Sequence, residues 1–273
     1  MSPRTKRKLL IIGGAEDHSD DCVILRRFVE LAGDGDARIL VVAAAAQRQA
    51  DAGDRYRRLF RDLGAGRVSV VAIPCRGAAE DPSAAREAGA ATGVFFTGGD
   101  QLRLTTLLGG TRLFAALQAA HQSGMVVAGT SAGAAAMSDT MIVEGDSDDA
   151  PKKCTVKMAP GMGFLAKVVV DQHFAQRGRI GRLLSAIAQN PSVLGLGLDE
   201  DTAVEIEPDQ PLWVVGSRTA TVVDGQTIAH TNTSQSKPEE ALAITGVTLH
   251  VLPSGYGYHL DKREVALPDG RMP

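Results

Sequence analysis

Short, continuous apolar runs recur along the first two hundred residues of the chain, and the segments between them have helical spacing. The runs are residues 8–14, 38–44, 68–74, 93–99 and 125–128. Helices are expected from Ser19 as N-cap, on the stripe from Tyr56 to Leu63, and over 101–108 and 112–122. Strands that are apolar on both faces belong to sheets covered on both sides. The pattern predicts an α/β fold with a mostly parallel sheet and helices on both faces.

The pattern changes after about residue 203. Apolar and polar residues alternate from there to the C-terminus, with turn residues between the runs and no clear helical stripe. A β-rich extension over about 203–273 is therefore predicted, built of antiparallel hairpins joined to the same sheet. No linker or low-complexity tract separates it, so residues 1–273 are expected to form a single domain.

Composition excludes several function classes. The formal net charge is −3, which argues against nucleic acid as a partner, because phosphate binding needs a basic face. No apolar run approaches membrane-spanning length, and the start of the chain has no leader-like h-region, so a cytoplasmic protein without a membrane partner is expected. Cys22, Cys75 and Cys154 are too far apart to suggest a disulfide framework or a zinc site. No metal or organic cofactor is expected.

Residues Gly129 to Gly133, GTSAG, match the G-x-S-x-G pattern directly after the last of these apolar runs. Between a strand and a helix, this spacing is typical of a nucleophile elbow that exposes the serine hydroxyl at the edge of a sheet. The alternative is a turn of small residues that only packs closely against a neighbouring helix. The nearest cysteine, Cys154, is more than twenty residues away, which argues against thiol chemistry. Ser131 is the candidate nucleophile.

A nucleophilic serine needs a base and a group that orients the base. Among six histidines, His173 follows an apolar strand-like run and is expected to share the edge of the sheet with Ser131. Another apolar run, expected to end at the same edge, is followed by Asp199, Glu200 and Asp201, any of which could orient the imidazole. The alternatives are a histidine that caps a hydrogen-bond network and a solvated acidic turn. The order serine, histidine, acid differs from the order in α/β-hydrolases.

Acyl transfer also needs backbone N–H groups that stabilise the oxyanion. Gly99, in a glycine pair after an apolar run, and Ala132, directly after the serine, are the natural pair of donors. The alternative is an ordinary strand-to-helix turn with Asp100 as N-cap, and both can hold at once.

Five blocks together resemble the cyanophycinases, serine exopeptidases of peptidase family S51: IIGGAED, FFTGGDQLRL, GTSAGAAAMS, DQHFAQRGRIGRL and GLGLDEDTA. The resemblance implies a class I glutamine amidotransferase-like, flavodoxin-like fold, a homodimer, and a Ser131–His173–Glu200 triad. It implies hydrolysis of cyanophycin, multi-L-arginyl-poly-L-aspartic acid, to β-Asp-Arg dipeptides through an acyl-enzyme. The implied substrate-binding residues are Gln101, Asp171, Gln172, Arg177, Arg179 and Arg182. One departure is Ala15, where a third glycine is expected.

The charges of segment 171–182 suit a polymer whose repeat carries one guanidinium and one carboxylate. Asp171 could bind a guanidinium and the three arginines could bind carboxylates. Apolar spacing predicts a helix from Ile180, with Arg177 and Arg179 beside His173 and Arg182 pointing towards the cleft. The alternative is a solvated basic helix face.

Three rival functions remain open on the sequence. An aspartyl dipeptidase of the same broad group would use the same machinery on short α-linked peptides. A catalytically inactive homologue could bind acidic or arginine-rich peptides without cleaving them. A dinucleotide-binding domain is disfavoured, because G-x-G-x-x-G is absent after the first apolar run.

Overall fold

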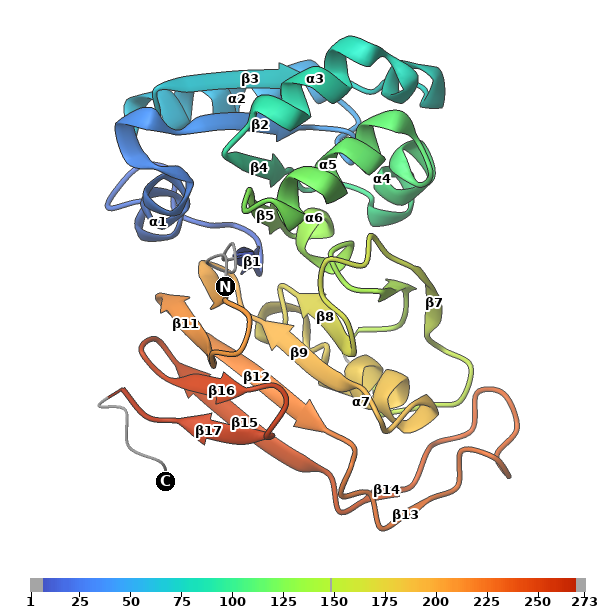
Figure 1. The fold of residues 1–273 in the computed structure, drawn as a ribbon. Helices are drawn as coiled ribbons and strands as arrows, with labels where there is room; N and C mark the ends of the chain where they lie inside the picture. The colour runs from blue at the N-terminus through green and yellow to red at the C-terminus, as the bar shows by residue number, and fades with distance from the viewer. Residues whose placement is uncertain (1–6, 148, 269–273) are drawn as a thin grey trace, which may run out of the picture.

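A computed structural model describes residues 7–147 and 149–268, and its main feature is a mixed sheet of nine strands (Figure 1). Five strands run parallel to one another: β1 (Leu9–Ile12), β2 (Arg38–Val42), β3 (Arg67–Val71), β4 (Gly93–Phe96) and β5 (Val126–Thr130). Four antiparallel strands extend the sheet beyond β1: β10 (Thr202–Ile206), β11 (Leu212–Gly216), β16 (Gly257–His259) and β17 (Glu264–Ala266). The order is β17-β16-β11-β10-β1-β5-β4-β2-β3.

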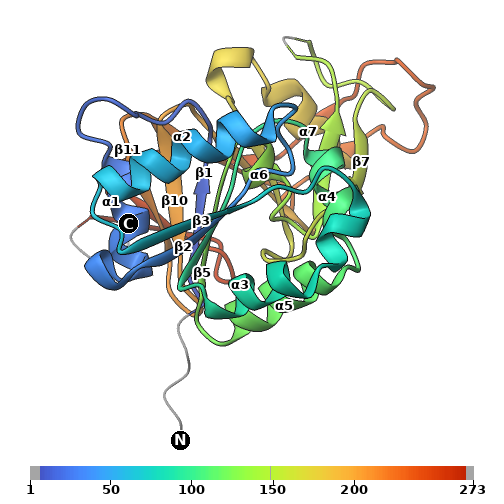
Figure 2. The same ribbon diagram turned by 90° about the horizontal axis from the view of Figure 1, so that it is seen from above.

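Helices cover both faces of the parallel strands (Figure 2). On one face lie α1 (Val23–Ala32) and α2 (Gln49–Asp62), and on the other lie α3 (Pro82–Ala90), α4 (Gln101–Leu108) and α5 (Arg112–Gln122). Leu10 and Ile12 of β1 belong to the core beneath α1 and α2, whereas Leu9 and Ile11 belong to the core on the opposite face. Two buried faces explain why the strands are apolar throughout. The predicted fold class is confirmed.

A second sheet has four strands in the order β15-β12-β9-β8. Their bounds are β8 (Val168–Gln172), β9 (Leu194–Leu198), β12 (Thr219–Asp224) and β15 (Thr248–Pro253). One of its faces packs into the same core as α4 and α5, and α7 (Ile180–Gln189) covers the other face. From Thr202 onward the described chain forms strands and loops without helices, as expected for the β-rich extension. Four of its strands join the sheet of β1 as predicted, but β12 and β15 pair in the second sheet, so the expectation of a single shared sheet is wrong.

The remaining described elements are short. They are α6 (Ala132–Ala135), the pairs β6 (Thr140–Glu144) with β7 (Lys157–Pro160) and β13 (His230–Thr231) with β14 (Ile244–Thr245), and 3₁₀ turns at Asp34–Asp36, Arg76–Glu80 and Ala175–Arg177. In the part of the chain that the structure describes, no helix has the length and hydropathy needed to span a bilayer.

The expectation that His173 and the acidic turn share one sheet with Ser131 is wrong. β10 pairs with the free side of β1, so β8 and β9 are excluded from that position and form the second sheet. The two sheets meet at Gly13, whose carbonyl accepts a hydrogen bond from the His173 amide at 2.9 Å. A Cβ on Gly13 would lie 2.0 Å from the Asp199 carbonyl oxygen, so this close approach requires glycine.

The structure also differs from the sequence analysis at two helices. The first helix begins at Val23 rather than after Ser19, because the Asp17 carboxylate accepts hydrogen bonds from the amides of Ser19, Asp20 and Cys22 and holds them in a turn. Helix α3 was not predicted, although its start carries a recognisable signal. Asp81 caps it by accepting from the Ser83 amide, and proline occupies the first helical position.

Candidate active site

Ser131 lies in the sharp turn between β5 and α6, with φ 52° and ψ −112°. A side chain at positive φ costs on the order of 1–3 kcal/mol and persists only where the surroundings hold it. The neighbouring glycines allow the turn to pack tightly. A Cβ on Gly133 would lie 2.4 Å from the Phe96 carbonyl oxygen, and one on Gly129 would lie 2.7 Å from the Gly133 backbone. The local geometry is that of a strained elbow.

Ser131, His173 and Glu200 form a continuous hydrogen-bonded chain. Ser131 Oγ is 3.0 Å from His173 Nε2, and His173 Nδ1 is 2.7 Å from Glu200 Oε1. The three side chains follow β5, β8 and β9, so the chain bridges the two sheets. Gly14 supports the imidazole from behind, since a Cβ there would lie 2.5 Å from the ring. This is the arrangement that a serine nucleophile, a base and an orienting acid require.

The electrostatic surroundings keep His173 uncharged near neutral pH. Burial lowers the pKa of the imidazole below its ordinary value, and the positive charges of Arg177 and Arg179 lower it further. The hydrogen bond and charge of Glu200 act in the opposite direction but do not outweigh them. A neutral imidazole that shares its Nδ1 proton with Glu200 presents the lone pair of Nε2 to the serine hydroxyl.

The three adjacent carboxylates have three different surroundings. Glu200 contacts His173, and its amide donates to Gln176 Oε1 at 2.9 Å. Asp199 turns inward and accepts from the Ala175 amide and the Thr219 hydroxyl. Asp201 accepts from the Asp17 amide and the Ser217 hydroxyl. Sequence reasoning from the residues left the choice open, and the geometry brings Glu200 to the imidazole.

The two expected oxyanion donors flank Ser131. Ala132 is the first residue of α6, and the glycine turn at 98–99 lies against the serine, since a Cβ on Gly98 would lie 3.3 Å from Ser131 Cβ. Among the described residues, neither the Gly99 nor the Ala132 amide donates a hydrogen bond. Asp100 also caps α4 by accepting from the amides of Leu102 and Arg103, so the alternative interpretation of this turn holds as well.

Asp171 and Arg182 form a buried ion pair instead of facing the cleft. Asp171 is 1% exposed and Arg182 is 8% exposed. Arg182 Nε donates to Asp171 Oδ2 at 2.6 Å, and Nη2 donates to Oδ1. The expectation that Arg182 points into the cleft is therefore wrong, because its partner on β8 is itself buried. With both carboxylate oxygens engaged, Asp171 is not available to an incoming guanidinium.

The other predicted binding residues divide between buried and exposed. Arg179 is buried and donates to Gln172 Oε1 at 2.6 Å, while its Nε has no hydrogen-bond partner. Burial lowers the pKa of Arg179 to about 10. Arg177 is exposed, and within the described chain no carboxylate lies at ion-pair distance from it. Gln101 donates to the carbonyl oxygens of Ile142 and Val143.

Sequence reasoning assigned no role to the residues that follow Gly14. Ala15 has φ 46°, which explains why glycine was expected there. Glu16 is buried and accepts hydrogen bonds from Thr130, Tyr56 and His18. Burial alone raises its pKa, but these three donors outweigh burial and hold the pKa of Glu16 below its ordinary value. The signal in the sequence was the position of Glu16, a carboxylate that directly follows the glycines between the first strand and the first helix.

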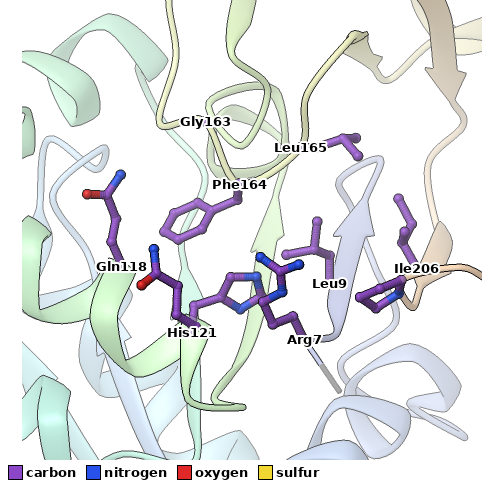
Figure 3. Close-up of a pocket in the computed structure, with 10 residues that line it drawn as sticks. Arg7, Leu9, Gln118, His121, Gly163, Phe164, Leu165 and Ile206 are labelled. Atoms are coloured by element: carbon purple, nitrogen blue, oxygen red, sulfur yellow. The ribbon is translucent and has the colours of Figure 1, made fainter. Parts of the chain in front are cut away.

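A separate pocket of about 300 Å³ opens at the start of β1, whereas Ser131 follows the end of the neighbouring parallel strand β5 (Figure 3). Arg7, His121 and Phe164 line it, and it contains none of the predicted site residues. His121 Nδ1 is 2.9 Å from the Met125 carbonyl oxygen, and its ring packs edge-on against Phe164. The pocket is therefore distinct from the candidate active site.

In the described residues, no group of three or more histidine, cysteine, aspartate or glutamate side chains could hold a metal ion.

Two sequence comparisons identify the same family, and a structural comparison shows a similar fold. The sequence model of peptidase family S51 matches residues 9–214. The chain is 41% identical over 262 residues to a cyanophycinase of Trichormus variabilis, covering 96% of this chain and 88% of that protein. It is 40% identical over 260 residues to a cyanophycinase of Geminocystis herdmanii, covering 95% and 96%. The crystal structure of a peptidase from an acI-B1 Actinobacterium has a similar fold, with a TM-score of 0.63, 20% identity, and coverage of 88% and 96%.

Proposed function

The chain belongs to peptidase family S51, and we propose that it is a serine-type exopeptidase that hydrolyses cyanophycin to β-Asp-Arg dipeptides. The hydrogen-bonded chain from Ser131 through His173 to Glu200 carries the proposal for the chemistry. The substrate class rests on about 40% sequence identity, over nearly the whole chain, to proteins named cyanophycinase.

In the proposed mechanism, His173 Nε2 accepts the proton of Ser131 as the hydroxyl attacks a backbone carbonyl carbon of the polyaspartate. The amides of Gly99 and Ala132 stabilise the tetrahedral oxyanion. His173 then donates its proton to the leaving amine, which leaves an acyl-enzyme on Ser131. Water, deprotonated by His173, then attacks the carbonyl carbon of that ester, and His173 returns the proton to Ser131 Oγ as the acyl group leaves. Glu200 stabilises the imidazolium in both steps. The sequence of steps needs no cofactor.

We propose a division of labour for substrate binding. Arg177 is exposed beside His173 and suits a free carboxylate of the polymer or its chain end. Asp171 and Arg182 act beneath the surface, where they hold the segment that carries Gln172 and Arg179. Gln101 anchors β6 next to the site through the carbonyl oxygens of Ile142 and Val143.

The assembly and location are also part of the proposal. Residues 1–273 act as one peptidase domain, a view supported by four late strands that extend the sheet containing β1. The protein works as a cytoplasmic homodimer without a nucleic-acid or membrane partner. Light scattering coupled to size-exclusion chromatography would measure a mass near twice 28.6 kDa for a dimer.

The direct test is incubation of the protein with purified cyanophycin granules, followed by mass analysis of the soluble products. The proposal expects β-Asp-Arg dipeptides from the native protein and none from Ser131→Ala. Cleavage of α-linked aspartyl dipeptides, with intact granules, would indicate a dipeptidase instead. Binding of polymer without any product would indicate an inactive homologue.

A further inference from the structure

Glu16 places a carboxylate in the interior directly behind the nucleophile turn. The residue is 5% exposed. Its Oε2 accepts a hydrogen bond from Thr130 Oγ1 at 2.5 Å, and its Oε1 accepts one from Tyr56 Oη at 2.6 Å. The three residues come from the β1–α1 loop, the end of β5 and α2. One buried carboxylate thus joins three elements that are far apart in sequence.

This carboxylate is unsuited to acid–base catalysis. Both of its oxygens are occupied by hydroxyl donors, and neither Ser131 nor His173 is among its hydrogen-bond partners. An enclosed carboxylate is tolerated only where donors satisfy it, and such groups fix the relative positions of the elements that bond to them. Its effect on the reaction must therefore pass through one of its partners.

Thr130 is the partner that leads to the site, because it directly precedes the strained Ser131. Ser131 is otherwise held through its backbone, with its amide donating to Ile12 O and its carbonyl accepting from the Ala135 amide. The Thr130 hydroxyl adds a charge-assisted side-chain anchor one residue before the positive-φ position. Strain at a functional residue persists when such contacts over-determine it.

The loop that carries Glu16 also holds the base and the acidic turn. Gly13 O accepts from the His173 amide, and Gly14 lies against the imidazole. Asp201, next to Glu200, donates from its amide to Gly14 O at 2.9 Å and accepts from the Asp17 amide at 3.0 Å. The loop over residues 13–17 therefore contacts both sheets at the point where the triad bridges them.

We propose that Glu16 is a positioning residue, which couples the Ser131 turn to the loop that holds His173 and thereby sets the distance between hydroxyl and imidazole. The inference rests on Ser131 being the nucleophile of the proposed function. Loss of the link lowers the reactivity of Ser131 while leaving the exposed substrate contacts in place. It therefore lowers kcat and not the affinity for substrate.

Two near-isosteric variants give a matched test, because each removes one hydroxyl donor from the same carboxylate. Thr130→Val breaks the link to the turn, and Tyr56→Phe breaks the link to α2. The readouts are the melting temperature, the rate at which a fluorophosphonate labels Ser131, and kcat and KM on cyanophycin. The proposal expects labelling and kcat to fall at least fivefold further in Thr130→Val than in Tyr56→Phe, with KM within threefold of the native value. Thr130→Ser, which keeps the hydroxyl, is expected to restore most of the labelling rate.

If the labelling rate of Thr130→Val is less than fivefold lower than that of Tyr56→Phe, the proposal is overturned and Glu16 only stabilises the fold. If Thr130→Val shows no cooperative melting transition, Glu16→Gln is tested in its place. Its labelling rate is again compared with that of Tyr56→Phe, and a difference of at least fivefold is again expected. Labelling does not depend on cyanophycin. If cyanophycin is not the substrate, the native protein will not hydrolyse the polymer, but the labelling rates of the variants can still be compared.

Discussion

Two groups of ionisable side chains lie near the ends of the neighbouring strands β8 and β9, and their surroundings differ. Asp171, Arg179 and Arg182 are buried and bonded mainly to one another and to Gln172. His173 is nearly as buried as these residues, but Glu200 has a side chain that is 32% exposed, and the pair extends to the hydroxyl of Ser131. The charges of the first group are paired with one another, whereas in the second group an imidazole nitrogen faces the hydroxyl of Ser131.

This contrast separates charge that stabilises the fold from charge that acts on a ligand. Ion pairs in the interior require their partners, so removing one partner leaves an uncompensated charge. Substitutions in the hydrogen-bonded chain of Ser131, His173 and Glu200 should instead lower the activity and have little effect on the free energy of unfolding. The two groups should therefore respond to substitution in opposite ways, and the following variants test that opposition.

The largest effect is expected for Ser131→Ala. Hydrolysis of cyanophycin should fall by roughly 10⁴-fold or more, because the nucleophile is lost while binding is retained. The melting temperature should change little, since no buried hydrogen bond other than that to His173 is removed. Product release from granules measures the activity. Turnover near the native rate would exclude Ser131 as nucleophile.

The next effect is expected for Asp171→Asn and concerns stability. The substitution preserves shape but removes the negative charge between Arg182 and Arg179. The free energy of unfolding should fall by about 3–5 kcal/mol, as measured by denaturant titration. The double variant Asp171→Asn, Arg182→Met should recover part of the loss, because the buried guanidinium is then removed. An unchanged unfolding curve for the single variant would contradict the scaffold role.

Arg177→Ala should behave in the opposite way. The side chain is exposed and unpaired within the described residues, so stability should stay within about 0.5 kcal/mol. Loss of a charged contact to the polymer should lower kcat/KM by roughly tenfold. Arg58→Ala, an exposed arginine on α2, serves as the control. If both variants retain native kcat/KM, Arg177 does not bind substrate.

The pH dependence of activity tests the surroundings of His173. His173 must be neutral to accept a proton, so activity falls as the pH drops through its pKa. Burial, Arg177 and Arg179 all lower that pKa, so the acid limb of kcat/KM should have its midpoint below the ordinary value of 6.5. Arg177→Ala removes one positive charge and should move the midpoint upward. A midpoint above 6.5 in the native protein would contradict these surroundings.

The smallest effect concerns a residue outside both groups. Ala15 is exposed and has φ 46°, a conformation that disfavours a side chain. Ala15→Gly should raise the free energy of unfolding by about 1 kcal/mol. Activity should not change, because the Ala15 side chain is exposed and no catalytic role is proposed for it. A decrease in stability on denaturant titration would show that the Cβ is favourable there.

The sequence predicted those features that depend on local pattern. Apolar runs located the parallel strands, and the helices over 101–108 and 112–122 agree with α4 and α5. The elbow at Ser131 was predicted from the G-x-S-x-G pattern. The pattern is informative because the close packing of the turn requires glycine at 129 and 133. The helix start after Ser19 was wrong, because the Asp17 side chain binds the amides that a helix would have used.

Features that depend on pairing between distant segments could not be predicted. Whether β8 or β10 lies beside β1 is decided by tertiary competition for one edge, and a run of apolar residues carries no information about it. Arg182 was expected to point towards the cleft because it lies off the apolar stripe of the helix from Ile180, yet Asp171, eleven residues earlier, holds it inside. The same limitation hid Glu16, whose partners Tyr56 and Thr130 are 40 and 114 residues away.

The central claim is that a hydroxyl on one sheet is activated by an imidazole and a carboxylate on another. Fluorophosphonate labelling followed by peptide mapping tests it most directly, with the native protein, His173→Ala and Glu200→Gln compared at pH 7.5. We predict one adduct, on the peptide that contains Ser131, with a rate at least 100-fold lower in His173→Ala and intermediate in Glu200→Gln. An adduct on another residue, or equal rates in all three proteins, would contradict the account.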